Sequence, residues 1–112
     1  MLTMDEFSAL ALSFPGAVQG RHIEVDDFRV EGKIFATLRQ VDQRAVLKFS
    51  PDEQKLFMET APGMFEPVHG SWGQKGWTRV VLAKADAETV RHAMTYAWRS
   101  VAPKKLQARL KA

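Results

Sequence analysis

The sequence predicts an α+β domain in which an antiparallel β-sheet packs against helices in two layers. Segments with the apolar spacing of amphipathic helices lie near both ends of the chain, and short segments of alternating apolar residues lie between them. Turn residues separate these short segments. With 112 residues, of which 46% are hydrophobic and 26% charged, the chain fits a single domain over residues 1–112.

The first helix is expected to begin after Thr3 and to end at Pro15-Gly16. Thr3 and Glu6 have the T-x-x-E spacing of a capping box, in which each side chain bonds a backbone N–H of the other residue. The apolar residues that follow have the i, i+3, i+4, i+7 spacing of one helix face: Phe7, Leu10, Ala11 and Phe14. Proline and glycine then stop the helix.

Short strands are expected next. Residues 21–25 predict the first strand, and Asp26-Asp27 a turn. Residues 28–31 alternate, so that Phe28 and Val30 point inward, and Gly32-Lys33 is expected to close a tight hairpin.

Two further strands extend this pattern into an antiparallel meander. The first is expected to carry three apolar residues on one face: Ile34, Ala36 and Leu38. After a turn around residues 42–44, the second has three inward-facing residues: Ala45, Leu47 and Phe49.

A second helix is predicted from Ser50 to about Thr60. Ser50 and Glu53 repeat the capping-box spacing, and Pro51 occupies the first helical position. Residues 61–63 then end the helix. Residues 64–78 are rich in glycine and aromatic residues, and we expect a strand and then a loop over residues 69–76. A further strand is expected to run through Thr78, Val80 and Leu82.

Asp86 is expected to cap the last long helix. Its buried stripe is predicted from the helical spacing of its apolar residues: Val90, Ala93, Met94, Ala97, Trp98 and Val101. Pro103 either breaks this helix or begins a short final one that contains Leu106 and Leu110.

The composition excludes several kinds of chemistry. The chain has no cysteine, so it forms no disulfide, thiolate metal site or cysteine nucleophile, and this favours a reducing compartment. The N-terminus lacks the basic and apolar regions of a signal peptide, and no apolar run approaches the roughly 20 residues of a membrane span. We therefore expect a cytoplasmic protein with no membrane partner and no cofactor.

No pattern predicts catalysis or metal binding. The chain has no G-x-S-x-G motif, and Ser71 near His69 does not make a triad, because the fold brings triad partners together. His22, Glu24 and Asp26 alternate, which we interpret as the polar face of a strand rather than as a set of metal ligands. We expect no enzyme activity, no catalytic residues and no metal site.

The charge is divided along the chain. Residues 1–73 have a net charge of −4, whereas residues 74–112 have a net charge of +7, within a total of +3. The stretch 99–112 contains no acid and five basic residues: Arg99, Lys104, Lys105, Arg109 and Lys111. This stretch is either a patch that contacts phosphates or a solvated, solubilising tail.

Aromatic and basic residues also alternate between residues 69 and 79, after His69: Trp72, Lys75, Trp77 and Arg79. Aromatic rings stack on bases and cations contact phosphates, so these residues are candidates for a nucleic-acid-binding surface. The alternative is a packed hairpin in which Trp77 belongs to the core.

Several segments, in order, resemble the MmcQ/YjbR family of small bacterial proteins. They are Ser13-Phe14-Pro15-Gly16, Phe28 through Ala36 (FRVEGKIFA), Leu47-Lys48-Phe49-Ser50-Pro51, Trp77-Thr78-Arg79-Val80, and Ala97 with Val101 through Leu106 (VAPKKL). The resemblance covers nearly the whole chain. It implies an antiparallel sheet with helices packed on it, likened to a double-wing DNA-binding domain.

The leading hypothesis is therefore a DNA-binding protein that contacts mainly phosphates. The expected contacts are five basic residues: Lys75, Arg79, Arg99, Lys104 and Lys105. Three aromatic residues form a candidate stacking or ligand loop: His69, Trp72 and Trp77. The alternative is a protein-interaction or small-ligand-binding module without catalysis.

Overall fold

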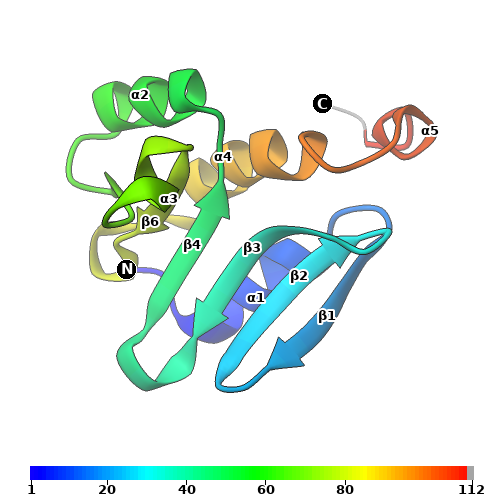
Figure 1. The fold of residues 1–112 in the computed structure, drawn as a ribbon, viewed down its shortest axis with the longest axis horizontal. Coiled ribbons are helices and arrows are strands. Elements are labelled where there is room, and N and C mark those ends of the chain that lie inside the picture. The colour runs from blue at the N-terminus through cyan, green and yellow to red at the C-terminus, as the bar shows by residue number, and fades with distance from the viewer. Residues whose placement is uncertain (111–112) are drawn as a thin grey trace.

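A computed structural model describes residues 1–110 and contains a six-stranded antiparallel sheet in the order β1-β2-β3-β4-β6-β5 (Figure 1). The strands are β1 (Ala17–His22), β2 (Val25–Val30), β3 (Lys33–Arg39), β4 (Arg44–Lys48), β5 (Phe65–Pro67) and β6 (Trp77–Val80). The helices are α1 (Met4–Leu12), α2 (Pro51–Thr60), α3 (Ser71–Gln74), α4 (Ala87–Arg99) and α5 (Lys104–Gln107). Two 3-10 turns complete the elements, η1 (Gln40–Asp42) and η2 (Leu82–Lys84).

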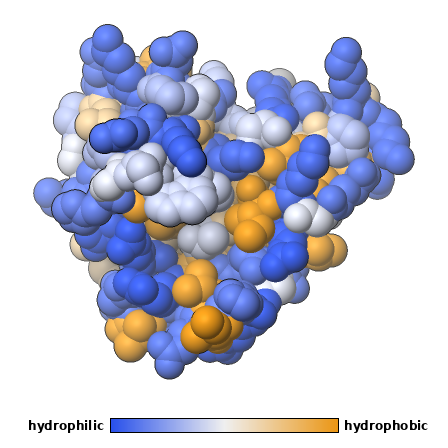
Figure 2. All heavy atoms as spheres, viewed as in Figure 1, coloured by the Kyte–Doolittle hydropathy of each residue, from blue (hydrophilic) through white to orange (hydrophobic). Residues whose placement is uncertain are grey.

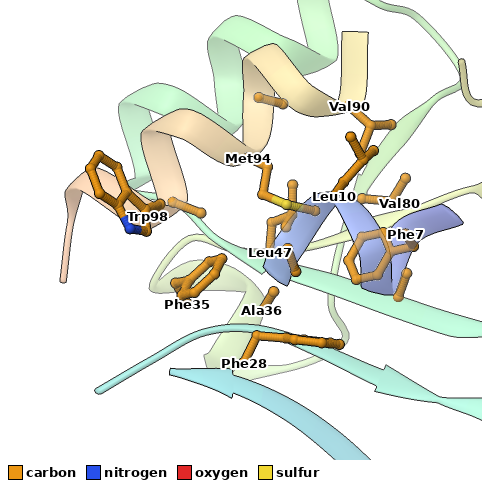
Figure 3. Packing of buried hydrophobic residues seen from close by; sticks show 14 of the residues in the cluster. Phe7, Leu10, Phe28, Phe35, Ala36, Leu47, Val80, Val90, Met94 and Trp98 are labelled. Atoms are coloured by element: carbon orange, nitrogen blue, oxygen red, sulfur yellow. The ribbon is translucent and has the colours of Figure 1, made fainter. Parts of the chain in front are cut away.

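The sheet and helices form two layers, as expected. Helices α1 and α4 cover one face of the sheet, behind the strands in Figure 1. Between them lies the core, whose large buried residues come from both helices and the strands (Figure 3): Phe7, Leu10, Phe28, Phe35, Leu47, Val80, Val90, Met94 and Trp98. The opposite face of the sheet, toward the viewer in Figure 1, is partly covered by α3 beside β6.

The predicted helix starts are confirmed. Thr3 Oγ1 accepts a hydrogen bond from Glu6 N (3.1 Å), and Glu6 Oε1 accepts one from Thr3 N (2.9 Å). Ser50 and Glu53 form the same reciprocal pair, at 3.1 and 2.8 Å. Asp86 Oδ2 accepts from the backbone N–H of Thr89 at 2.9 Å. These caps satisfy backbone donors that the first helical turn leaves without partners.

The first hairpin differs from the sequence expectation. Its turn falls at residues 23–24, and Asp26 and Asp27 lie inside β2, only 4% and 3% exposed. Two neighbouring carboxylates can occupy this strand because each has a partner. Asp26 accepts from Gln40 Nε2 at 3.0 Å, and Asp27 receives two hydrogen bonds from Arg29, at 2.6 and 3.0 Å.

The position of this turn also separates the three residues considered as metal ligands. His22 pairs with Val25, while Asp26 pairs with Arg21 and therefore lies on the other face of the sheet. The described residues 1–110 contain no group of three histidine or acidic side chains that could hold a metal ion. In the same range, no helix is long and apolar enough to cross a membrane.

A β-bulge in β3 corrects the predicted face of Ile34. Phe28 pairs with Ala36 and Arg29 with Ile34, so Phe35 is an extra residue between two pairs. Phe35 turns into the core, where its ring centroid lies 6.3 Å from that of Phe14. Ile34 consequently lies on the opposite face of the sheet from Ala36 and Leu38.

Four smaller expectations are also corrected or decided. The β2–β3 turn consists of Glu31 and Gly32, both at positive φ, rather than Gly32-Lys33. Leu82 belongs to η2 instead of a strand, and the expected loop over residues 69–76 contains α3. Pro103 precedes α5, so it begins a short final helix after α4 has ended at Arg99.

Acid should weaken the domain through the ion pair between the buried Asp27 and the partly exposed Arg29. The hydrogen bonds from Arg29 hold the pKa of Asp27 below its ordinary value of 3.8. A lowered folded-state pKa contributes stability above pH 3.8, and this contribution is lost as the pH falls through the lowered pKa. We expect Asp27→Asn to unfold at lower urea concentration than the wild type at neutral pH, with the difference shrinking in acid.

Urea unfolding at stepwise lower pH measures this effect. Glu59→Gln is the control, because Glu59 is exposed near the end of α2. A difference between Asp27→Asn and the wild type that stays constant below pH 3.8 would contradict the assignment to this ion pair.

Candidate functional site

The structure divides the predicted contact residues between two surfaces. His69, Trp72 and Lys75 lie in or beside α3, and Trp77 and Arg79 lie on the neighbouring β6. The other predicted contacts lie at the end of α4 and in α5: Arg99, Lys104 and Lys105. Figure 1 shows α3 and α5 on opposite sides of the view. The two groups therefore do not form one continuous contact surface.

Helix α4 and the segment after it carry a basic surface, which we define by five exposed residues: Arg91, Arg99, Lys104, Lys105 and Arg109. Figure 2 shows hydrophilic side chains projecting around this region, at the upper right. Each ion pair within residues 1–110 involves an arginine of the sheet instead: Arg21, Arg29, Arg39 and Arg79. Within the described residues, the basic surface thus keeps its charge available for an anionic partner. Lys111 lies outside the described residues.

The position of α5 explains why its lysines point outward. A Cβ added to Gly16 would lie 2.7 Å from Leu106 Cδ1, so Leu106 closes tightly over the turn after α1. Gln107 Nε2 donates to Ala102 O at 2.8 Å and ties α5 to the segment after α4. With one side of α5 held in this way, Lys104 and Lys105 are left in solvent.

A groove of about 440 Å³ lies beside the basic surface, between α4, the end of α1 and Leu110. Arg91 and Arg99 line it together with His92 and Tyr96, and Glu88 is the acid among its lining residues. Arg91 and Arg99 are about two helical turns apart on one side of α4. This spacing allows the groove to receive a chain of anionic groups rather than a single one.

The second surface is a hollow of about 340 Å³ on the face of the sheet opposite α1 and α4, which we call the sheet hollow. Its lining comes from β3, β4, β6 and the segment around α3: Ile34, Thr37, Arg44, Val46, Val68, Trp72 and Trp77. In Figure 2, apolar atoms gather over the middle of this face. The rings of Trp72 and Trp77 stand at 80° with centroids 5.9 Å apart, and form a corner of the hollow.

The remaining predicted residues of this surface have specific partners. Lys75 Nζ lies 5.2 Å from the ring centroid of Trp72, a cation–π contact. Arg79 donates to Glu66 Oε1 at 3.0 Å, so its charge is balanced across neighbouring strands. His69 lies exposed in the turn before α3 and does not line the hollow.

Sequence reasoning missed much of the sheet hollow. Arg44, Val46 and Ile34 come from two strands whose pairing sets the floor, and Ile34 reaches this face only through the bulge. Alternation marks Arg44 and Val46 as outward-facing on β4. Alternation does not predict that the chain returns over this face at α3, or that Val46 is buried there.

An antiparallel sheet with helices on one face and a second, partly open face defines the class: a two-layer α+β domain. A family model described as YjbR matches residues 12–100, and the chain belongs to this family. The family resemblance inferred from the sequence is therefore confirmed.

A solved structure supports the same fold. The crystal structure of the Deinococcus radiodurans protein DR2400, with the domain DUF419, is similar with a TM-score of 0.75 at 20% sequence identity. The match covers 97% of this chain and 88% of that chain. No curated protein matches this chain.

Proposed function

We propose that this protein binds DNA, mainly through phosphate contacts made by the basic surface. One observation carries the proposal: five exposed cations lie along α4 and in the segment that contains α5, and none forms an ion pair within residues 1–110. Such a cluster attracts a polyanion and releases the counterions condensed on it. The likeness of the family to double-wing DNA-binding domains supports the same function by analogy of fold.

Phosphate contact explains this surface better than base readout. The exposed side of α4 offers Arg91, His92, Thr95 and Arg99, without an asparagine or glutamine for bidentate contact to adenine. Thr95 Oγ1 already donates to Arg91 O at 2.9 Å. Binding through this surface should therefore depend strongly on salt and weakly on DNA sequence.

We propose further that the protein acts by binding and not by catalysis. Neither the groove nor the sheet hollow contains the Ser71–His69 pair considered from the sequence. A reducing cytoplasm, where DNA is available and a chain without cysteine needs no disulfide, is the compartment this function favours.

Fluorescence anisotropy with labelled duplex DNA tests the proposed surface. If all five cations of the basic surface contact phosphates, log affinity against log salt should have a slope of roughly −4 to −5. We expect Lys104→Glu/Lys105→Glu to weaken binding and to reduce the steepness of this slope by about 2.

The matched control is Lys55→Glu/Lys84→Glu, which changes the net charge equally on exposed residues of α2 and η2. Equal weakening by both double variants would show that only the total charge matters and would contradict a local contact surface. Absence of duplex binding by the wild type at low salt would refute the function.

A further inference from the structure

The basic surface does not use the sheet hollow, whose aromatic corner needs a different explanation. We propose that the hollow binds one unpaired nucleobase together with an adjacent phosphate, as presented by single-stranded DNA. This inference rests on the proposed function for the class of partner, but it uses other residues and another part of the fold. The observations that carry it concern how Trp72 is held, what shape it makes and which charges surround it.

Trp72 is held rigidly although 57% of it is exposed. A Cβ on Gly73 would lie 1.8 Å from Val68 O, and one on Gly76 would lie 1.9 Å from Phe49 O. Two glycines thus let the α3 segment press directly against neighbouring backbone. This close docking fixes the turn from which Trp72 projects.

Gln54 of α2 holds the same segment through hydrogen bonds. Its Nε2 lies 3.1 Å from Gly73 O, 3.2 Å from Trp77 O and 3.0 Å from Thr78 Oγ1. One amide therefore holds α3 and β6 together and sets the two tryptophans relative to each other. An exposed aromatic side chain placed this firmly loses little conformational entropy when a ligand stacks on it.

The shape of the hollow fits a flat group. Aliphatic side chains of Ile34, Val46 and Val68 line it, and Trp72 and Trp77 meet at 80° beside them. A planar ring can lie on the face of one indole while its edge meets the face of the other, which are the two favourable geometries of aromatic pairs. Thr37 adds a hydroxyl that can hydrogen-bond a ring nitrogen or carbonyl.

The charges select an anion beside that ring. Arg44 is the charged residue among those lining the hollow, and no carboxylate side chain of the described part of the chain lines it. The carboxylate of nearby Asp42 is already paired with Arg39, which donates hydrogen bonds of 2.6 and 2.9 Å to it. Lys75 lies over Trp72 and provides a second cation at the same corner.

A base with its phosphate uses every one of these features. An apolar protein side chain would bury itself against the indoles but would leave Arg44 without a role. An isolated phosphate would use the cations but would not need the aromatic corner. Sheet surfaces with aromatic and basic residues are a common platform for single-stranded nucleic acids, because every base offers a π-face.

Anisotropy with a labelled oligodeoxythymidine, compared with an abasic strand of equal length, tests the proposal. Both strands carry the same phosphates, so phosphate contacts alone would bind them equally. We expect the wild type to bind the oligodeoxythymidine at least roughly tenfold more tightly than the abasic strand, the effect of one stacked base. Equal affinities would overturn the proposal.

Variants locate the effect in the hollow. Trp72→Ala should reduce the preference for the oligodeoxythymidine, whereas Trp72→Phe should keep most of it because a phenyl ring still stacks. Arg44→Gln removes a phosphate contact that both strands can make, so it should weaken the binding of both. Lys84→Gln is the control, since Lys84 is exposed in η2 and does not line the hollow. An unchanged preference in Trp72→Ala, with the fold verified by circular dichroism, would also overturn the proposal.

The two proposals fail separately. If the wild type prefers the oligodeoxythymidine over the abasic strand but does not bind duplex DNA, the basic surface is refuted and the hollow stands. If it binds duplex DNA but does not distinguish the two single strands, the hollow is refuted and the basic surface stands. Thymidine monophosphate as a competitor then shows whether the base and phosphate suffice without a strand.

Discussion

Trp98→Ala is expected to lower the free energy of unfolding by about 3–5 kcal/mol, the usual cost of removing a fully buried tryptophan side chain. Trp98 lies on α4 and has no exposed surface. Its ring lies 5.6 Å from that of Phe14, and its Nε1 donates to Pro15 O at 2.9 Å. One side chain thereby joins the last long helix to the turn that ends the first. Truncation would leave both a cavity and an unsatisfied carbonyl group.

Urea unfolding monitored by circular dichroism measures this loss of stability without depending on tryptophan fluorescence. Trp98→Phe separates the two causes, because it keeps an aromatic ring against Phe14 and removes the hydrogen bond to Pro15. We expect Trp98→Phe to cost less than Trp98→Ala. If the two variants were equally destabilised, the hydrogen bond rather than the packing of the ring would hold the helices together.

The elements that could be predicted depend on neighbours in the sequence. The capping boxes at Thr3 and Ser50 and the apolar stripe of α4 follow from fixed spacings within one or two helical turns. The antiparallel class follows because short alternating segments separated by turns leave few other arrangements. The resemblance of several ordered segments adds the family.

The features that could not be predicted depend on partners distant in the sequence. Asp26 reads as part of a turn because its partner Gln40 is 14 residues away and meets it only once the strands pair. The bulge at Phe35 exists because the core accepts that ring beside Phe14. Tertiary packing overrides local propensity in both cases.

The kind of candidate site, a set of basic and aromatic residues, could be predicted from the sequence. The structure divides these residues between two separate surfaces. The C-terminal cations appear in the sequence as a run without acids, and the structure keeps them together. Arg79 belongs to the same basic half of the sequence, but the pairing of β5 with β6 sets it opposite Glu66. The net charge of a segment therefore indicates a charged surface without showing which members are balanced across the sheet.

Gly73→Ala is expected to lower the free energy of unfolding by about 2–3 kcal/mol, within the range for forcing an extra methyl group into a packed site. The new Cβ would lie 1.8 Å from Val68 O and 2.9 Å from Val68 C. Both are backbone atoms, so no side-chain rotation relieves the clash, and α3 must move away from the segment after β5. Gln54, which bonds Gly73 O, would lose part of its contact at the same time.

The movement should also disturb the Trp72–Trp77 corner, so Gly73→Ala links the stability of α3 to the binding of a base in the sheet hollow. Near-ultraviolet circular dichroism reports the tryptophan pair, and urea unfolding reports stability. Gln74→Ala is the matched control, because Gln74 is the next residue of α3, is exposed and should change stability by less than about 0.5 kcal/mol. If Gly73→Ala were as stable as Gln74→Ala, α3 would not be docked against Val68. The rigid presentation of Trp72, on which the base-binding proposal depends, would then lose its physical basis.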